Sequence, residues 1–225
     1  TLANQLSGRP AQVRSLVLTQ TCLHASMAGL RMAAPLYALE HGYSKVSVGA
    51  LVALFAVIQI FLAMPAGRYA DRNGVVRLIR WCVFACVAGA SLAALMPSYA
   101  ILCAAAVLSG ASIGVAMIAI QQHAGKLAGS STEMRRIFSW ISLAPAIANA
   151  IGPGLVGLII DRAGYTCAFV FLALIPLFGW AASRGIRDLR QAGSGGTANA
   201  SSMELLRKRP VRDVHVDGAQ VVHPR

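Results

Sequence analysis

Six long apolar stretches, separated by short polar or glycine-containing segments, occupy most of this chain. Their bounds are 15–38, 46–66, 76–96, 99–120, 137–160 and 166–183. A hydrocarbon core of about 30 Å is crossed by roughly 20 helical residues, and each stretch has about that length. The pattern therefore predicts an all-α integral membrane protein whose residues 1–184 form a six-helix bundle.

The overall composition supports this prediction. Hydrophobic residues make up 56% of the 225 positions and charged residues only 12%. Such a chain has too few polar groups to cover the surface of a soluble globule. The first apolar stretch is also too long and too polar for the core of a signal peptide, so we expect it to be a membrane span.

Positive charge is distributed unevenly between the loops. The formal net charge is +12, and the segments on one side of the predicted membrane carry most of the basic residues before the tail: Arg9, Arg14, Arg68, Arg72, Arg77, Arg80, Lys126, Arg135 and Arg136. The alternate loops hold only Lys45 and Arg162. By the positive-inside rule, both termini are expected in the cytoplasm, with the chain in a plasma membrane such as the bacterial inner membrane. A nucleic-acid partner is not expected, because no aromatic residues interleave with the basic tail.

One loop motif occurs twice, 90 positions apart. The pattern G-x-x-x-D-R-x-G is carried by Gly67, Asp71, Arg72 and Gly74, and again by Gly157, Asp161, Arg162 and Gly164. Three apolar stretches separate equivalent points, so the copies are expected on opposite membrane faces, as in a 3+3 inverted repeat. The glycines permit close approach and a left-handed turn, and Asp71 is placed to face the positive end of the next helix.

The first copy, Gly67-x-Tyr69-Ala70-Asp71-Arg72-x-Gly74, resembles the loop signature between the second and third spans of the major facilitator superfamily. The segment Gly152-Pro153-x-x-Val156-Gly157 resembles the antiporter signature of drug–proton exchangers in that superfamily, although Ser139 and Ala148 replace two of its glycines. The superfamily's arginine of the fourth span is absent, since Ala106 stands in its place. The resemblance implies half of a 12-span transporter that moves a small solute by alternating access, with proton-coupled efflux as the favoured mode.

The first span carries the strongest candidates for a ligand site. Gln20, His24 and Arg31 are separated by four and seven residues, which places them on one helical face. A polar stripe on a bilayer-crossing helix usually faces a cavity or a partner helix. Other spans supply further candidates, which ordinary helix–helix hydrogen bonding explains almost as well: Gln59, Ser109, Ser112, Ser142 and Asn149.

The carboxylates indicate the charge of the substrate. None of the eight acidic residues lies in the middle of an apolar stretch, so a cation would find no partner there. An arginine without a compensating carboxylate favours an anionic group on the substrate. His24 is the group suited to carry a proton near neutral pH. Lipid phosphate is a second expected partner, through Arg72.

Neither a cofactor nor a metal is expected. The five cysteines, Cys22, Cys82, Cys86, Cys103 and Cys167, lack the spacing of a metal site or a disulfide framework. An enzyme is not expected either. Gly110-x-Ser112-x-Gly114 fits the G-x-S-x-G pattern of an intramembrane serine protease, but no later span has the histidine base it would need. Packing of small residues between helices is the other explanation.

After the sixth stretch the character of the chain changes. Residues 185–225 form a predicted cytoplasmic segment, with a Gly, Ser and Ala linker at 191–202 and a basic amphipathic stretch at 204–212. No seventh apolar stretch follows. We therefore expect that transport requires a second six-helix half or a second copy, and the alternative is a truncated membrane component that does not transport.

Overall fold

The computed structural model describes residues 2–186, with the side chains of residues 2–9 and 71–73 left out. Almost all of the predicted tail domain, 185–225, lies outside the described residues. Within the described part every regular element is a helix: α1 (Leu2–Glu40), α2 (Lys45–Asn73), α3 (Val75–Leu95), α4 (Tyr99–Leu127) and α5 (Ser131–Ser183). The prediction of an all-helical protein is confirmed.

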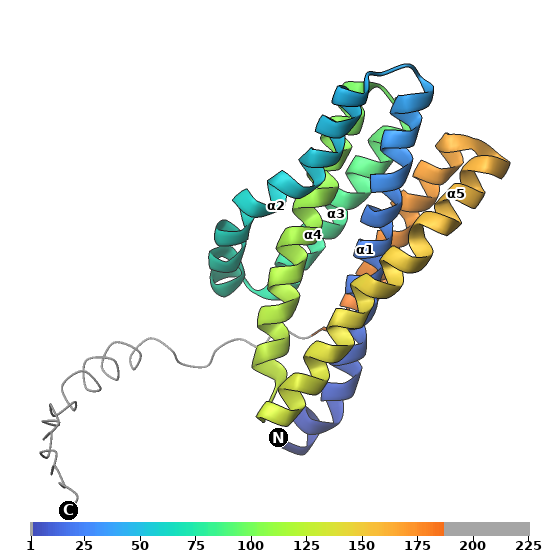
Figure 1. Cartoon of the computed structure of the whole chain (residues 1–225). Coiled ribbons are helices and arrows are strands. Elements are labelled where there is room, and N and C mark those ends of the chain that lie inside the picture. The colour runs from blue at the N-terminus through green and yellow to red at the C-terminus, as the bar shows by residue number, and fades with distance from the viewer. Residues whose placement is uncertain (1, 187–225) are drawn as a thin grey trace, which may run out of the picture. The chain divides into compact units, whose positions relative to one another are not determined.

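The long helix α5 contains the fifth and sixth predicted spans. Gly164 interrupts it with φ 80° and ψ 172°, a conformation that is not helical. The two parts fold back on each other as a hairpin (Figure 1). A residue with a side chain would be strained at this positive φ, which explains why a glycine stands at the reversal.

Two of the helices have a serine side chain as their N-terminal cap. The hydroxyl of Ser44 accepts the N–H of Ser47 at 3.1 Å at the start of α2. At the start of α5, Ser130 Oγ accepts the N–H of Glu133 at 3.2 Å, and Glu133 Oε2 accepts the N–H of Gly129 at 2.8 Å. These bonds satisfy backbone donors that the first turn leaves unpaired, so they define where the chain re-enters the bundle.

By length and composition alone, four described helices can cross a membrane. They are Lys45–Ala70, Val75–Leu95, Tyr99–Leu127 and Ser131–Ser183. The first predicted span does not meet this standard, because Gln20, His24 and Arg31 lower the hydropathy of α1. The position of α1 offsets this low hydropathy, because α1 contacts all the other helices, α5 most extensively, and is largely surrounded by protein and not by lipid. A helix surrounded by protein can carry polar groups that lipid would not accept.

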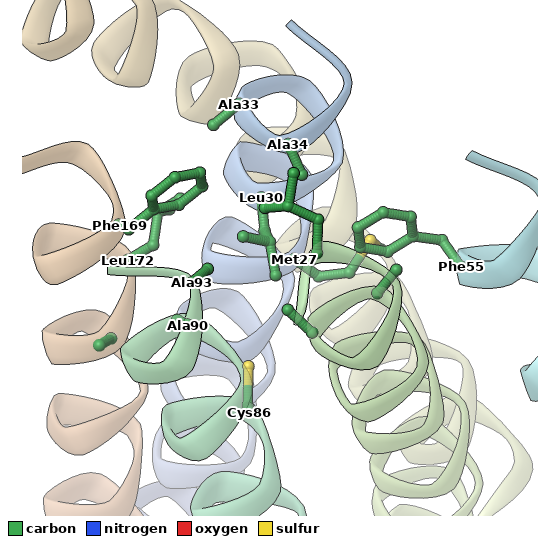
Figure 2. Packing of buried hydrophobic residues seen from close by; sticks show 14 of the residues in the cluster. Met27, Leu30, Ala33, Ala34, Phe55, Cys86, Ala90, Ala93, Phe169 and Leu172 are labelled. Atoms are coloured by element: carbon green, nitrogen blue, oxygen red, sulfur yellow. The ribbon is translucent and has the colours of Figure 1, made fainter. Parts of the chain in front are cut away.

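The core is formed by large side chains that meet across small ones. Met27 and Leu30 of α1, Phe55 of α2 and Phe169 and Leu172 of α5 converge in Figure 2. Alanines lie between them on α1 and α3: Ala33, Ala34, Ala90 and Ala93. Hydrophobic burial does not drive association inside a bilayer, so close packing through small residues is the main source of attraction between these helices.

Two hydroxyls of α1 bond to the backbone of α5. Ser26 Oγ donates to the Leu172 carbonyl at 2.7 Å, and Thr19 Oγ1 donates to the Gly179 carbonyl at 3.1 Å. The Leu172 carbonyl is left without its usual helical donor, because Pro176, four residues further on, has no N–H. These two bonds fix the register of α1 against the last part of α5.

Basic and aromatic residues mark the two ends of the bundle. At the end where α1 begins, which we call the basic end, lie Arg14, Arg68, Arg77, Arg80, Lys126, Arg135, Arg136 and Arg184. All three tryptophans, Trp81, Trp140 and Trp180, lie within about three helical turns of the basic end. At the opposite end, which we call the tyrosine end, Tyr37 meets Tyr165 and Tyr43 meets Tyr99, each pair with ring centroids 5.2 Å apart. Such belts of Trp and Tyr are typical of the two membrane–water interfaces.

Candidate functional site

The three residues of the polar stripe on α1, Gln20, His24 and Arg31, differ in how deeply they are buried. Gln20 and His24 are 1% and 5% exposed, whereas Arg31 is exposed. His24 Nδ1 lies 3.1 Å from the carbonyl oxygen of Gln20. Neither polar atom of the Gln20 side chain has a hydrogen-bond partner within the described part of the chain. An unpaired buried amide is costly, so the position beside Gln20 is suited to a ligand group or an ordered water.

Arg31 lies nine residues from the end of α1, about 13 Å along the helix. No ion pair to its guanidinium is found among the described residues. Its exposure leaves the charge available at the surface of the bundle, on the same helical face as Gln20 and His24. The structure thus brings the first two residues of the stripe together inside the protein and places the third nearer the tyrosine end.

Four of the other five polar candidates are hydrogen-bonded within their own helices. Gln59 Nε2 donates to the Phe55 carbonyl at 2.8 Å, and Ser112 Oγ donates to the Leu108 carbonyl at 2.6 Å. Two candidates on α5 are exposed and do the same: Ser142 Oγ donates to Phe138 and Asn149 Nδ2 to Pro145, each at 2.8 Å. Ser109 is buried beside Cys86, with 3.9 Å between Oγ and Sγ.

The G-x-S-x-G segment of α4 is a packing surface. A Cβ on Gly110 would lie 2.5 Å from the carbonyl oxygen of Phe55, and one on Gly114 would lie 3.1 Å from the Gln59 side chain. The two glycines therefore let α2 approach α4 closely. Since Ser112 donates to its own helix, the geometry supports the packing explanation and not a protease nucleophile.

The two copies of the loop motif share backbone conformation. Gly74 has φ 87° and Gly164 has φ 80°, and each follows a helix and precedes the next. In the second copy, Asp161 and Arg162 are exposed. In the first copy, the side chains of Asp71 and Arg72 lie outside the described residues, although their backbone is helical.

The glycines that open the two copies also make equivalent contacts. A Cβ on Gly67 would meet Gln122 of α4 at 3.4 Å, and one on Gly157 would meet Met32 of α1 at 3.2 Å. Gly157 lies 90 positions after Gly67, and Met32 lies 90 positions before Gln122. The glycine of one copy therefore corresponds to the glycine of the other, and so do their partners, but the order along the chain is reversed. Gly89 and Gly179, also 90 positions apart, lie against the same two helices: Gly89 meets α4 at Ala105 and Leu108, and Gly179 meets α1 at Thr19 and Cys22. Their partners lie 86 positions apart, so this second correspondence is shifted by about one helical turn.

The antiporter-like segment packs against α1 beside the polar stripe. Gly152 is buried, and a Cβ there would lie 3.6 Å from both the Ala25 carbonyl oxygen and the Ala28 side chain. Pro153 follows it inside α5, and Gly157 meets Met32 one turn further along. The motif therefore holds α5 close to the part of α1 that carries His24.

A cavity that sequence reasoning missed lies between the N-terminal half of α1 and the first turns of α5. Its volume is about 920 Å³. It is lined by Pro10, Val13, Arg14, Val17, Leu18, Glu133, Arg136, Ile137 and Trp140. Arg14 and Arg136 were interpreted from the sequence only as topology signals. Nothing in their spacing could have shown that residues 122 positions apart would face one cavity.

Among the described residues, no group of three or more His, Cys, Asp and Glu side chains is placed to hold a metal ion. The five cysteines are free thiols.

Comparisons with known proteins place this geometry in a family. The family model described as Major Facilitator Superfamily matches residues 16–213. Among solved structures, the fold is similar to crystal structures of a mutant of the peptide transporter POT in complex with alafosfalin, with TM-score 0.70, and in complex with sulfate, with TM-score 0.69. Both share 15% sequence identity with this chain and match 87% of it. The chain spans only 44% and 43% of their respective lengths. No curated protein matches.

The match of the family model over most of the chain agrees with the loop motif, the apolar helices and the transporter-like fold. Those helices make the chain a multi-pass membrane protein. The chain belongs to the Major Facilitator Superfamily.

Proposed function

We propose that this chain is one six-helix half of a transporter that moves a small solute by alternating access. The observation that carries the proposal is the buried pair Gln20 and His24, whose Gln20 amide has no hydrogen-bond partner within the described residues. The pair lies on α1, the helix that contacts all the others. Polar groups left unpaired inside a membrane bundle mark a substrate or ion path.

The proposal also requires a second six-helix half, or a second copy of this chain, to complete the transporter. The chain covers less than half of the similar transporter structures, and exposed apolar side chains line α2: Val46, Val57, Ile60, Phe61 and Met64. A second six-helix half or a second copy is expected to cover part of this surface, and lipid the rest. The exchanged contacts of Gly67 and Gly157 support a 3+3 inverted repeat, which would provide one gate at each membrane face.

Proton-coupled efflux is the proposed mode of transport. The antiporter-like glycines pack α5 against α1 at Ala25 and Ala28, next to His24. Because a histidine changes charge near neutral pH, a proton on His24 would alter the site at the centre of this contact. The motif residues Asp71, Arg72, Asp161 and Arg162 are proposed to bias the two gates between their open and closed states.

An anionic group on the substrate is favoured. Arg31 is exposed on the stripe, and no ion pair to it is found among the described residues. The described acidic side chains, Glu40, Glu133 and Asp161, all lie near helix ends or turns. The bundle therefore offers a positive charge without a built-in neutralising partner, which suits an anion.

The proposed orientation places the basic end in the cytoplasm, in accordance with the positive-inside rule. Both termini are then cytoplasmic, and the tail at 185–225 would follow the bundle on that side. A plasma membrane, in bacteria the inner membrane, is the proposed location.

The function is tested by uptake and binding of candidate anionic and cationic solutes across pH, with the chain reconstituted in vesicles. Arg31→Gln is expected to weaken anion binding about tenfold or more, and Arg31→Lys less, because lysine keeps the charge but loses the fork of donors. His24→Gln should flatten the pH dependence without abolishing binding. Lys45→Gln, an exposed charge at the start of α2, is the matched control.

Anion binding by Arg31→Gln equal to that of the unmodified chain would refute the role of Arg31. Binding without transport by the chain alone, restored by co-reconstitution of a second six-helix half, would show that the missing partner and not the site limits transport. Absence of both binding and transport would favour the alternative, that the chain is a membrane component without transport activity.

A further inference from the structure

The cavity at the basic end is formed by two helical stripes that face each other. On α1 the lining residues are Pro10, Val13, Arg14, Val17 and Leu18, and on α5 they are Glu133, Arg136, Ile137 and Trp140. Both sets follow the i, i+3, i+4 spacing of a single helix face. The walls are therefore two rigid helices, each anchored in the bundle further along its length.

The three charged side chains that line this cavity all lie toward its basic end. Arg14 and Arg136 are exposed, and no ion pair to either guanidinium is found among the described residues. Glu133 lines the same cavity, but its Oε2 accepts the N–H of Gly129 and lies at the positive end of α5. Val17, Leu18 and Trp140 lie one turn further into the bundle. An occupant would meet two arginines and one glutamate toward the basic end, beside Pro10 and Val13, and only apolar or aromatic side chains further in.

We propose that this cavity binds an anionic phospholipid of the surrounding membrane. Arg14 and Arg136 would hold the phosphate, with one guanidinium from each helix, and Val17, Leu18 and Trp140 would hold the start of an acyl chain. The site lies at the basic end, where the tryptophans place the membrane–water interface and lipid phosphates are concentrated. A volume of about 920 Å³ is far larger than an inorganic anion requires, and it suits a headgroup with part of its tail.

This site is separate from the proposed transport site. It uses neither Gln20, His24 nor Arg31, and lipid binding requires no second half. A bound lipid would bridge the N-terminal half of α1 and the first turns of α5, and it would stabilise that contact more as the lipid concentration rises above its Kd.

Trp140 provides the test, because it lines the cavity. In a background with Trp81→Phe and Trp180→Phe, the full chain is reconstituted into nanodiscs containing lipids with brominated acyl chains, which quench tryptophan on contact. Brominated phosphatidylglycerol should quench Trp140 more strongly than brominated phosphatidylcholine at equal mole fraction. Arg14→Gln and Arg136→Gln should each reduce the preference for the anionic lipid about fivefold, the effect of one basic residue at a membrane surface.

Arg135→Gln is the matched control, since Arg135 is the exposed neighbour of Arg136 on α5 and does not line the cavity. The control should retain the preference, and circular dichroism should show equal helix content in all variants. Equal quenching by the two lipids in the unmodified chain, or an equal loss with Arg135→Gln, would overturn the proposal. Release of the lipid by millimolar inorganic phosphate would also overturn it, because the site would then recognise the free anion.

Discussion

At the scale of single residues, the distance from a glycine's Cβ position to its neighbours shows whether the glycine is needed for close helix packing. Gly110 lies on the contact between α4 and α2, where a Cβ would meet the Phe55 carbonyl oxygen at 2.5 Å and Ile58 Cγ2 at 2.9 Å. Gly125 lies on the same helix with nothing within 4 Å of a Cβ. Two glycines of one helix therefore have opposite tolerance for a side chain.

We predict that Gly110→Ala destabilises the bundle by about 1–3 kcal/mol, because the added methyl group forces α2 and α4 apart at a backbone contact. Gly125→Ala should be neutral or slightly stabilising, since alanine is the better helix former and its side chain meets open space. Thermal unfolding followed by circular dichroism in detergent measures both. Equal melting temperatures for the two variants would contradict this account of the α2–α4 contact.

At the scale of elements, the turn inside α5 depends on one backbone conformation. Gly164 has φ 80°, and nothing lies within 4 Å of where its Cβ would be. A substitution there meets conformational strain without a steric clash. Gly154, in the first part of the same helix, also has open space around its Cβ position and no positive φ.

Gly164→Ala is therefore expected to lower stability by about 1–3 kcal/mol, the cost of holding a residue with a Cβ at a positive φ with ψ near 180°, a region that essentially only glycine occupies. Gly164→Asn should lower stability about as much, because asparagine tolerates a positive φ mainly where ψ is near about 47°, whereas ψ at Gly164 is 172°. Gly154→Ala serves as the control and should not lower stability. The three variants are compared by thermal unfolding, and a Gly164→Ala protein as stable as the Gly154→Ala control would show that the reversal does not need a positive φ.

At the scale of the whole molecule, the charge distribution and the order of helices predict one orientation. Ser44 precedes α2 at the tyrosine end and Ser131 begins α5 at the basic end, and both are exposed. Single cysteines at these positions, in a background without the five native cysteines, should react with an impermeant maleimide from opposite sides of the membrane. The Ser131 position is expected to face the cytoplasm. Labelling of both from one side would refute the six-crossing topology.

The repeated loop motif gives a second prediction at this scale. Asp71→Asn should lower transport in the complete assembly while membrane insertion stays nearly unchanged, because the lost charge would shift the balance between inward-open and outward-open states. Lys45→Gln controls for the loss of an unrelated exposed charge. Transport rates and insertion are measured in the same vesicles, and a normal rate for Asp71→Asn would reduce the motif to an ordinary turn.

Much of the architecture could be predicted from the order of residues alone. Apolar stretches of about 20 residues indicate helices because the bilayer has a fixed thickness and offers no hydrogen bonds. The repeat at Gly67 and Gly157 was visible as a pattern, and the family match confirms the superfamily that its first copy resembled. The first span is the exception, because Gln20, His24 and Arg31 lower its hydropathy below that of the other spans. Its contacts with all the other helices explain how it can carry these polar residues.

The candidate site could be predicted only in part. Periodicity placed Gln20, His24 and Arg31 on one face of α1, because the pitch of a helix is set locally. Their different burial depends on which helices pack over α1, and that is decided by contacts between residues far apart in the chain, such as Ser26 with Leu172 and Gly152 with Ala25. The cavity between Arg14 and Arg136 has the same origin. A local pattern determines which side chains share a helix face, whereas tertiary packing determines what each face meets.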